Sequence, residues 1–264
     1  VPFFIYAGEL MGRGSVAQRL VDFVQSAASP VRGSLGITTV GTTTIFGAIS
    51  GAIAAAVATI GKVMYPAMRK AGYPDHFAAG LITAVGAIDI IIPPSIPMIV
   101  YGAAAEESVP RLYAAGIIPG LLIAGMLAAY VIWYCRKHDI GRGSPFEWKR
   151  FVYATQRGLW ALGAPFIILG GIYGGMFSAT EAAAVACIYA GLVTRFVFHE
   201  LTFKDIVEAA SATAVFSAQI LIIVACAGVF SWILTSNQVP SMLAAWLQHY
   251  SVTPWMFLLA INVL

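Results

Sequence analysis

The sequence predicts an all-α, polytopic membrane protein. Apolar residues make up 59% of the chain and charged residues only 10%, and the mean hydropathy of +0.84 lies far above that of a soluble domain. Two segments, Leu112–Tyr134 and Ala209–Thr235, carry almost no charge over the roughly 20 residues that a spanning helix needs. The alternative, a soluble protein with a very apolar core, would need polar helix faces that these segments lack.

Two apolar segments contain breaks that an ordinary helix would not tolerate. Phe46–Ala54 is a run of small residues centred on Ser50 and Gly51, and Ile90–Val100 holds three prolines within five residues. Because proline lacks a backbone donor and clashes with the preceding turn, several carbonyls in the second segment lose their helical partners. Broken helices at membrane depth are tolerated where they are buried in protein or line a cavity, and in transporters the freed groups commonly coordinate substrate or ions.

The first part of the chain, residues 1–33, is expected to hold a partial scaffold span and an interfacial helix. Val1–Met11 has the character of the end of a span, and Val16–Val24 has apolar positions at helical spacing with charges on another face. The chain begins without methionine and stops inside an apolar run, so we expect it to be a fragment of a longer protein.

Residues 34–111 are expected to form a first hairpin and a broken helix. The small residues of Ser34–Met64 permit close backbone approach, and the break near Ser50-Gly51 predicts a re-entrant hairpin with two half-length arms. After a polar turn, the arms Phe77–Ile92 and Ser95–Ala105 flank the proline break.

Residues 112–157 are expected to form a scaffold span, Leu112–Tyr134, followed by the basic loop Cys135–Arg157. Basic residues outnumber acidic ones in this loop, so the positive-inside rule places it in the cytoplasm. The basic residues of the loop are Arg136, Lys137, Arg142, Lys149, Arg150 and Arg157.

Residues 158–198 predict a second hairpin region, interrupted by Pro165 and a glycine cluster. Phe177–Ala186 resembles Phe46–Ala58 in having an aromatic residue, a hydroxyl-bearing break and an alanine-rich arm. This internal repeat predicts an inverted-repeat transporter with re-entrant helical hairpins and broken helices, in which the site lies between two halves of opposite topology.

The last region, residues 199–264, is expected to contain an amphipathic linker and further spans. The linker is His199–Glu208, and the spans are Ala209–Thr235 and Met242–Leu264.

Four longer strings in this order resemble the large membrane subunit of tripartite ATP-independent periplasmic (TRAP) transporters, over the whole chain. They are Phe46–Gly51, Ile91–Gly102, Ala115–Gly120 and Gly170–Ala186. The resemblance implies an elevator fold like that of the ion transporter superfamily and a multi-pass protein of the bacterial inner membrane. It also implies that an N-terminal piece and about one quarter of the subunit at its C-terminal end lie outside this chain.

The resemblance further implies a function and partners. The large subunit transports an organic acid, such as a C4-dicarboxylate or sialic acid, and sodium is the coupling ion. Its partners are a small membrane subunit, a periplasmic substrate-binding protein, the carboxylate substrate and the lipid bilayer, with no role for nucleic acid.

A first sodium site carried over from this family would involve Ser50 and Ala52 at the hairpin tip, with backbone oxygens near Asp89, Ile92 and Pro94. A hard cation prefers oxygen ligands, which a broken helix supplies. Two positions depart from the family pattern, which commonly has serine at Ala52 and glycine at Asp89. Asp89 is either a sodium or proton ligand or a structural partner of a donor such as Lys62 or a backbone group, because a buried charge needs a partner.

Ser95, Ser178 and Thr180 are the candidate substrate-binding residues, since each hydroxyl lies at a break. Ser95 could equally satisfy a local carbonyl. Glu181 is interpreted as a helix cap. No arginine lies within a hairpin core, so the substrate carboxylate is expected to meet half-helix N-termini, hydroxyls or an arginine outside this chain.

The sequence does not favour an enzyme. It lacks the HExxH and GxSxG motifs and has no paired aspartates in its spans, and its three cysteines lack metal-ligand spacing. The competing class is a channel or another ion-coupled carrier that works without a binding protein.

Overall fold

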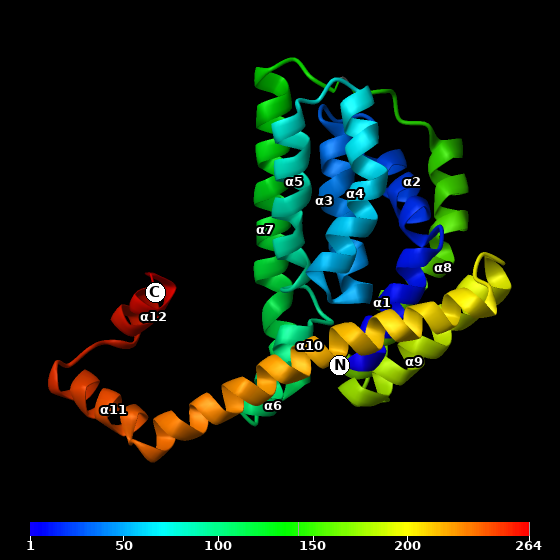
Figure 1. The fold of residues 1–264 in the computed structure, drawn as a ribbon. Helices are drawn as coiled ribbons and strands as arrows, with labels where there is room; N and C mark the ends of the chain where they lie inside the picture. Colours follow the sequence, from blue (N-terminus) through cyan, green and yellow to red (C-terminus); the bar gives the residue numbers. More distant parts are fainter. Residues whose placement is uncertain (142, 264) are drawn as a thin grey trace. The chain divides into compact units, whose positions relative to one another are not determined.

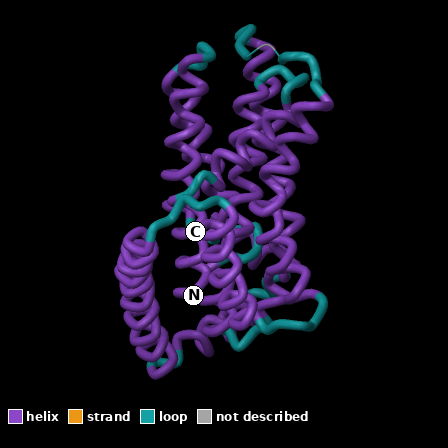
Figure 2. The backbone as a smooth tube through the Cα atoms, turned by 90° about the vertical axis from the view of Figure 1, so that its right-hand side faces the viewer, coloured by secondary structure: helices purple, strands orange, loops and turns teal. Residues whose placement is uncertain are grey.

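The computed structural model describes residues 1–141 and 143–263, so Arg142 and Leu264, named above, lie outside the described residues. All regular elements in the described ranges are helices, as expected from the sequence (Figure 1, Figure 2). Their bounds are α1 Pro2–Arg13, α2 Val16–Ala28, α3 Ser34–Ser50, α4 Ile53–Lys70, α5 Asp75–Asp89, α6 Ile96–Ala104, α7 Val109–Lys137, α8 Trp148–Tyr173, α9 Ala179–Leu192, the π-helical η1 Val193–Val197, α10 Phe203–Ser236, α11 Val239–His249 and α12 Pro254–Val263.

Three of these helices are long and apolar enough to cross a membrane. They are Val109–Lys137, Ala179–Val197, which combines α9 with η1, and Phe203–Ser236, and Pro254–Val263 is a shorter apolar helix. The long helices support the predicted membrane protein. The continuous span predicted over Met242–Leu264 is wrong, because α11 ends at His249 and α12 begins at Pro254. Proline cannot continue a preceding helix but suits the first turn of a new one.

The chain divides into two compact units, Val1–Ser217 and Ala218–Leu264. The first unit contains α1 to α9, η1 and the first part of α10, and it holds all the residues of the site described below. The second unit contains the rest of α10 together with α11 and α12, whose large apolar side chains are mostly exposed.

The first hairpin is formed by α3 and α4, which lie side by side (Figure 1). The predicted break at Ser50-Gly51 is confirmed: α3 ends at Ser50, Gly51 has a φ of 58° and Ala52 is extended. A φ in this region strains any residue with a Cβ, so glycine suits this turn. The second arm is longer than predicted and runs to Lys70.

The proline break is also where the sequence predicts it. The first arm, α5, ends at Asp89, residues 90–95 are not helical, and α6 begins at Ile96. The long helix α7 packs closely on this break because Gly116 and Gly120 have no side chains. A Cβ at Gly116 would collide with the Ile91 carbonyl oxygen, and one at Gly120 would lie 2.5 Å from Cγ1 of Ile92.

The second hairpin consists of α8 and α9. Helix α8 begins within the predicted basic loop, at Trp148, and continues through Pro165, so the predicted interruption there is wrong. Proline is tolerated in membrane helices where neighbouring groups satisfy the freed backbone. The turn after Tyr173 ends at Ser178, which caps α9, whereas Ser50 lies at the end of the first arm of its own hairpin. In both segments a break is followed by an alanine-rich helix, α4 or α9, but the serine of the break ends a helix in the first case and caps one in the second.

Helix α10 starts earlier than the sequence suggests. The predicted linker His199–Glu208 is helical from Phe203 onward. Thr202 sets this start, because its hydroxyl accepts a hydrogen bond from the Asp205 amide at 3.3 Å while the Asp205 carboxylate accepts one from the Thr202 amide at 2.8 Å. Such reciprocal bonds satisfy amide groups that the first helical turn leaves free.

The core of the first unit lies along α1, α2, α3, α8 and α9. Helix α2 packs between α3 and α8, and its apolar face, including Val16, Leu20 and Val21, is buried there. The second core cluster joins α3, α5 and α7, where the ring of Phe77 stacks on Tyr134 with centroids 4.1 Å apart. These clusters hold the two helix breaks against each other.

Candidate functional site

The two backbone breaks of the first unit meet at one point. A Cβ placed on Gly51, at the hairpin tip, would lie 2.5 Å from the carbonyl oxygen of Pro94 in the proline break. This approach is closer than a side-chain carbon tolerates, so it depends on glycine. The contact places two segments with freed backbone groups, more than forty residues apart in the sequence, against each other.

A buried carboxylate lies where these breaks meet. Asp89 is 0% exposed and Ser50 is 1% exposed. The Ser50 hydroxyl donates to Oδ1 of Asp89 at 3.2 Å, whereas Oδ2 of Asp89 is buried and has no hydrogen-bond partner. Gly47 makes room for this carboxylate, since a Cβ there would lie 2.8 Å from Oδ1. A buried carboxylate oxygen without a donor favours a bound cation or proton.

The proline break adds carbonyl oxygens to this carboxylate. In a continuous helix the carbonyls of Asp89 and Ile90 would accept hydrogen bonds from residues 93 and 94, but both are prolines and have no N–H. The Ser95 hydroxyl replaces the donor to Ile90, at 2.5 Å. The Asp89 carbonyl gains no such replacement from Pro93, so it remains a candidate cation ligand beside the Asp89 side chain.

The structure brings together the residues predicted for the sodium site. Ser50, Asp89 and Pro94 meet at the breaks, and Ile92 is buried in the same segment. The amide of Ala52 lies 3.5 Å from the Ser50 hydroxyl, while its carbonyl already accepts the Ala56 amide of α4.

Two of the three predicted substrate-binding hydroxyls, those of Ser95 and Ser178, have local roles. Ser95 bonds to Ile90 and caps α6, which is the local alternative weighed for it above. Ser178 and Glu181 form a capping box at the start of α9, which confirms the capping interpretation of Glu181. Ser178 and Thr180 are exposed, and neither lines the cavity beside Ser50. The structure therefore does not join the two hairpin tips into one site.

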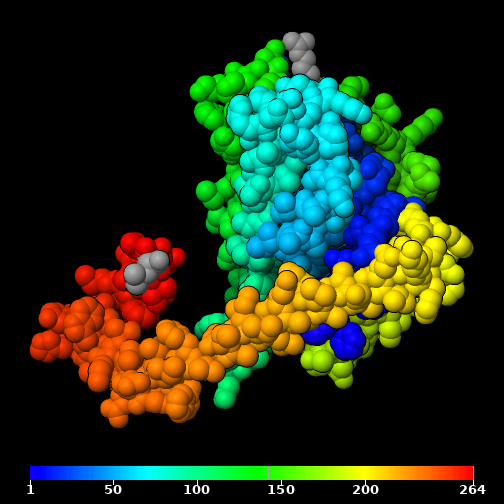
Figure 3. Space-filling model, in the orientation of Figure 1, coloured from blue at the N-terminus to red at the C-terminus, as the bar shows by residue number. Residues whose placement is uncertain are grey.

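A cavity of about 670 Å³ adjoins the first hairpin tip. It is bounded by α1, α4 and the first part of α10, which share one face of the molecule in the space-filling view (Figure 3). Small side chains form much of its wall, which explains the open volume. The lining residues are Ile5, Gly8, Glu9, Gly12, Arg13, Ser50, Ala52, Ala54, Ala55, Ala58, Thr59, Lys62 and Phe216.

Helix α1 can approach the hairpin tip because it carries glycines on this side. A Cβ at Gly8 would lie 2.8 Å from the Cα of Ser50, and one at Gly12 would lie 3.2 Å from Oγ1 of Thr59. One end of the cavity is therefore formed by Ser50, whose hydroxyl bonds to Asp89 behind it.

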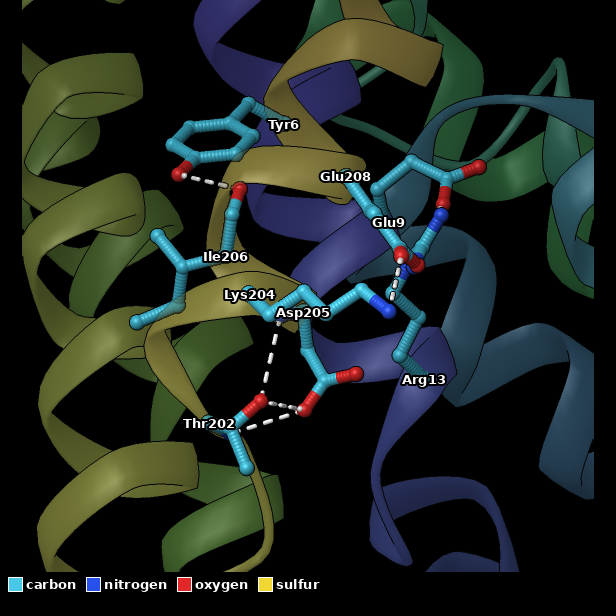
Figure 4. A network of polar contacts seen from close by, with 8 residues as sticks. All are labelled: Tyr6, Glu9, Arg13, Thr202, Lys204, Asp205, Ile206 and Glu208. Carbon is cyan, nitrogen blue, oxygen red and sulfur yellow. Dashed lines mark hydrogen bonds and ion pairs between the residues drawn. The ribbon is translucent and has the colours of Figure 1, made fainter.

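Charged residues line the other end of the cavity. Arg13 contacts two carboxylates, Glu9 at 3.4 Å and Glu208 at 3.2 Å, and Lys204 approaches Glu208 at 3.9 Å (Figure 4). Lys62 has no ion pair or hydrogen bond through its ammonium group within the described ranges, and it does not pair with Asp89. The structural partner considered for Asp89 is therefore not Lys62.

Sequence reasoning considered Lys62 only as a possible partner of Asp89 and missed it as a residue of the cavity. The available signal was its spacing: Ala55, Ala58, Thr59 and Lys62 recur at helical intervals, so they lie on one face of α4. That face contributes to the cavity wall.

The candidate cation site contains a single carboxylate. Within the described ranges, no group of three or more histidine, cysteine, aspartate or glutamate side chains could hold a metal ion. One carboxylate with hydroxyl and carbonyl oxygens suits a hard ion of low charge better than a transition metal.

These features define a helical membrane protein in which broken helices surround a buried polar site. The family model described as "Tripartite ATP-independent periplasmic transporter, DctM component" matches residues 1–264, so the chain belongs to this family.

Curated relatives agree with this assignment. The chain is 36% identical to the C4-dicarboxylate TRAP transporter large permease protein DctM of Pseudomonas aeruginosa, over 100% of the chain and 62% of that protein. It is 43% identical to the ectoine TRAP transporter large permease protein TeaC of Halomonas elongata, over 91% of the chain and 56% of that protein. It is 34% identical to the 2,3-diketo-L-gulonate TRAP transporter large permease protein YiaN of Escherichia coli, over 100% of the chain and 62% of that protein. The chain thus spans about 60% of the length of these relatives, whose names give different substrates.

Proposed function

We propose that this chain is part of a transport subunit that couples the inward movement of sodium to the uptake of an organic acid. The buried Asp89 carboxylate, with Oδ2 unpartnered where two helix breaks meet, is the observation that carries the proposal. Sodium would contact this carboxylate, the Ser50 hydroxyl and freed carbonyls of the proline break. Burying an unpaired charge is costly, so cation binding would stabilise the closed contact between hairpin and break.

The proposed coupling follows from the position of Ser50. Its side chain bonds to Asp89 on one side, and Ser50 lines the cavity on the other. A cation that draws Ser50 and Asp89 together would therefore fix one wall of the cavity before a substrate binds there. This arrangement makes the affinities for the two ligands mutually dependent.

The proposal includes an elevator mechanism with two inverted repeats, in the bacterial inner membrane. The hairpins α3–α4 and α8–α9 would move relative to spans such as α7, and the basic residues before α8 would face the cytoplasm. A small membrane subunit and a periplasmic binding protein would complete the transporter. The family membership and the names of the relatives support these partners.

Uptake in proteoliposomes tests the proposal. The full-length subunit, with its small membrane subunit and binding protein, would be assayed with labelled succinate and ectoine under an inward sodium gradient and in sodium-free buffer at matched pH. We expect sodium-dependent uptake that falls strongly in Asp89→Asn and Ser50→Ala. Asp75→Asn is the matched control, because this carboxylate on the same helix is exposed and pairs with Arg69.

Two results would each reject one part of the proposal. Uptake that is indifferent to sodium but follows a proton gradient would reject sodium coupling and make Asp89 a proton site. Uptake of free substrate without any binding protein would reject the tripartite arrangement and favour the competing class of carriers.

A further inference from the structure

We propose that the cavity beside the first hairpin binds the carboxylate group of an organic anion and that Lys62 is the positively charged residue that selects it. This inference rests on the proposed function and assigns a substrate-binding residue to the same region.

Lys62 carries the available positive charge in this cavity. Arg13, which also lines the cavity, pairs with Glu9 and Glu208, and Lys204 approaches Glu208 (Figure 4). Glu9, which also lines the cavity, is held by Arg13. Lys62 thus lines an open volume, and its ammonium group forms no ion pair with a carboxylate of the described ranges. A lysine ammonium in this position can donate to an anion that enters.

The helix that carries Lys62 supplies a second positive feature at its start. Helix α4 begins after Ala52, whose side chain cannot cap it, and no side-chain hydrogen bond caps the helix. The first amide groups of a helix have no intrahelical acceptor and carry a partial positive charge. Ala52, Ala54 and Ala55 line the cavity, so this uncapped end adjoins the same volume as Lys62.

The distance between the two features limits the size of the ligand. Ile53 and Lys62 are nine positions apart on α4, which corresponds to about 14 Å along the helix axis. Side chains on a helix lean toward its N-terminus, so Lys62 reaches back over Ala58 and Ala55 and shortens the gap. A small organic anion, with a carboxylate at one end and a second polar group at the other, fits between Lys62 and the helix start.

The cavity wall explains why Lys62 can act over this volume. Gly8, Gly12, Ala55 and Ala58 have little or no side chain, and Thr59 is a hydroxyl-bearing residue of α4 that lines the cavity. Apolar walls with a few placed polar groups are typical of small-molecule sites.

The reactivity of a cysteine in the cavity wall measures whether the cavity prefers anions, without knowledge of the substrate. In a full-length subunit assembled with its partners and lacking Cys135, Cys187 and Cys226, Thr59→Cys places a reporter in the cavity wall. We would measure its reaction rates with an anionic and a cationic methanethiosulfonate of similar size. Replacing Lys62 with glutamine should lower the anionic-to-cationic rate ratio about three- to tenfold.

Two further variants separate charge from structure. Lys62→Arg should keep the rate ratio near that of the parent, because it retains the charge. Lys70→Gln should leave the ratio unchanged, because Lys70 is an exposed lysine at the end of the same helix and does not line the cavity. An unchanged ratio in Lys62→Gln overturns the inference.

Transport kinetics give the second readout. For succinate or ectoine, whichever the wild type transports, we expect Lys62→Gln to raise KM at least tenfold, with a smaller change in kcat, because a charge-assisted hydrogen bond to the carboxylate is lost. Lys62→Arg should recover part of this loss. A KM that is unchanged in Lys62→Gln removes Lys62 from the substrate site.

The two proposals fail in different ways. If the wild type transports neither acid with sodium, the proposed function fails for these substrates, while the thiol ratio still decides whether the cavity prefers anions. If sodium-dependent uptake is intact and insensitive to Lys62, only the cavity assignment fails.

Discussion

Replacing Asp89 with asparagine should remove the stabilisation of the protein by sodium. The variant keeps the size of the side chain and an oxygen that can accept from Ser50, as Oδ1 does at 3.2 Å in the wild type. It removes the negative charge at Oδ2, which has no hydrogen-bond partner. The perturbation therefore isolates the charge of the candidate cation site from its packing.

The expected magnitude follows from linkage between binding and folding. Sodium at about 100 times its Kd stabilises the folded state by about 2.7 kcal/mol. For a compact unit such as Val1–Ser217, each kcal/mol changes Tm by about 2–4 °C, so sodium should raise the Tm of the wild type by about 5–10 °C. In sodium-free buffer, Asp89→Asn should be more stable than the wild type, because burying an unpaired carboxylate costs several kcal/mol.

The assay is thermal unfolding of the purified full-length subunit in detergent, in sodium chloride and in choline chloride of equal ionic strength. Asp75→Asn serves as the control and should keep the full sodium shift, although it loses its contacts with Tyr65 and Arg69. If Asp89→Asn retains the sodium shift of the wild type, the carboxylate does not contact the cation and the reasoning is refuted.

Three other predictions concern the same unit. Gly47→Ala should lower Tm, because its Cβ would lie 2.8 Å from Oδ1 and 3.0 Å from the Cα of Asp89, and an overpacking cost of about 1–3 kcal/mol exceeds the gain in helix propensity. Gly80→Ala is the control and should raise Tm, because a Cβ there has nothing within 4 Å. Equal changes in Tm would contradict the close contact at Gly47. Ala52→Ser should stabilise the hairpin by about 1 kcal/mol by capping α4, seen as a higher Tm, and an unchanged Tm would show that the serine does not cap. Although partial burial opposes it, hydrogen bonds from Ser15 lower the pKa of Glu200, so this contact should stabilise the fold above about pH 4.3 and lose its effect as the pH falls through the lower folded pKa. Glu200→Gln should therefore show a smaller fall in Tm than the wild type between pH 6 and pH 3. An equal fall in the two proteins would show that the contact does not contribute to acid sensitivity.

Much of the fold could be predicted from the sequence because it depends on local chemistry. The apolar composition indicates a membrane protein, and the two breaks follow from residues that cannot continue a helix. Gly51 takes the left-handed turn and the prolines remove backbone donors, so the hairpin tip and the proline break were predicted correctly, although α5 ends at Asp89 rather than at Ile92. The capping role of Glu181 was likewise readable, since it needs only the residue three positions before it.

Both main errors concern the effect of a proline on a helix. The sequence predicted a break near Pro165, but α8 is continuous there, and a single span over Met242–Leu264 that the structure divides. Proline alone does not determine whether a helix ends, because the outcome depends on which other groups satisfy the freed carbonyls.

The sequence by itself determined the class of protein, the positions of the breaks at Gly51 and at Pro93-Pro94, and the residue types that could bind a cation. Only the tertiary structure decided which of these residues meet. Gly47, Gly51 and Gly116 allow helices to approach until the Asp89 carboxylate lies against Ser50, and this approach depends on the positions of three helices at once. The role of Lys62 required the same information, because an unpaired charge becomes a candidate site only when the surrounding helices leave a cavity beside it.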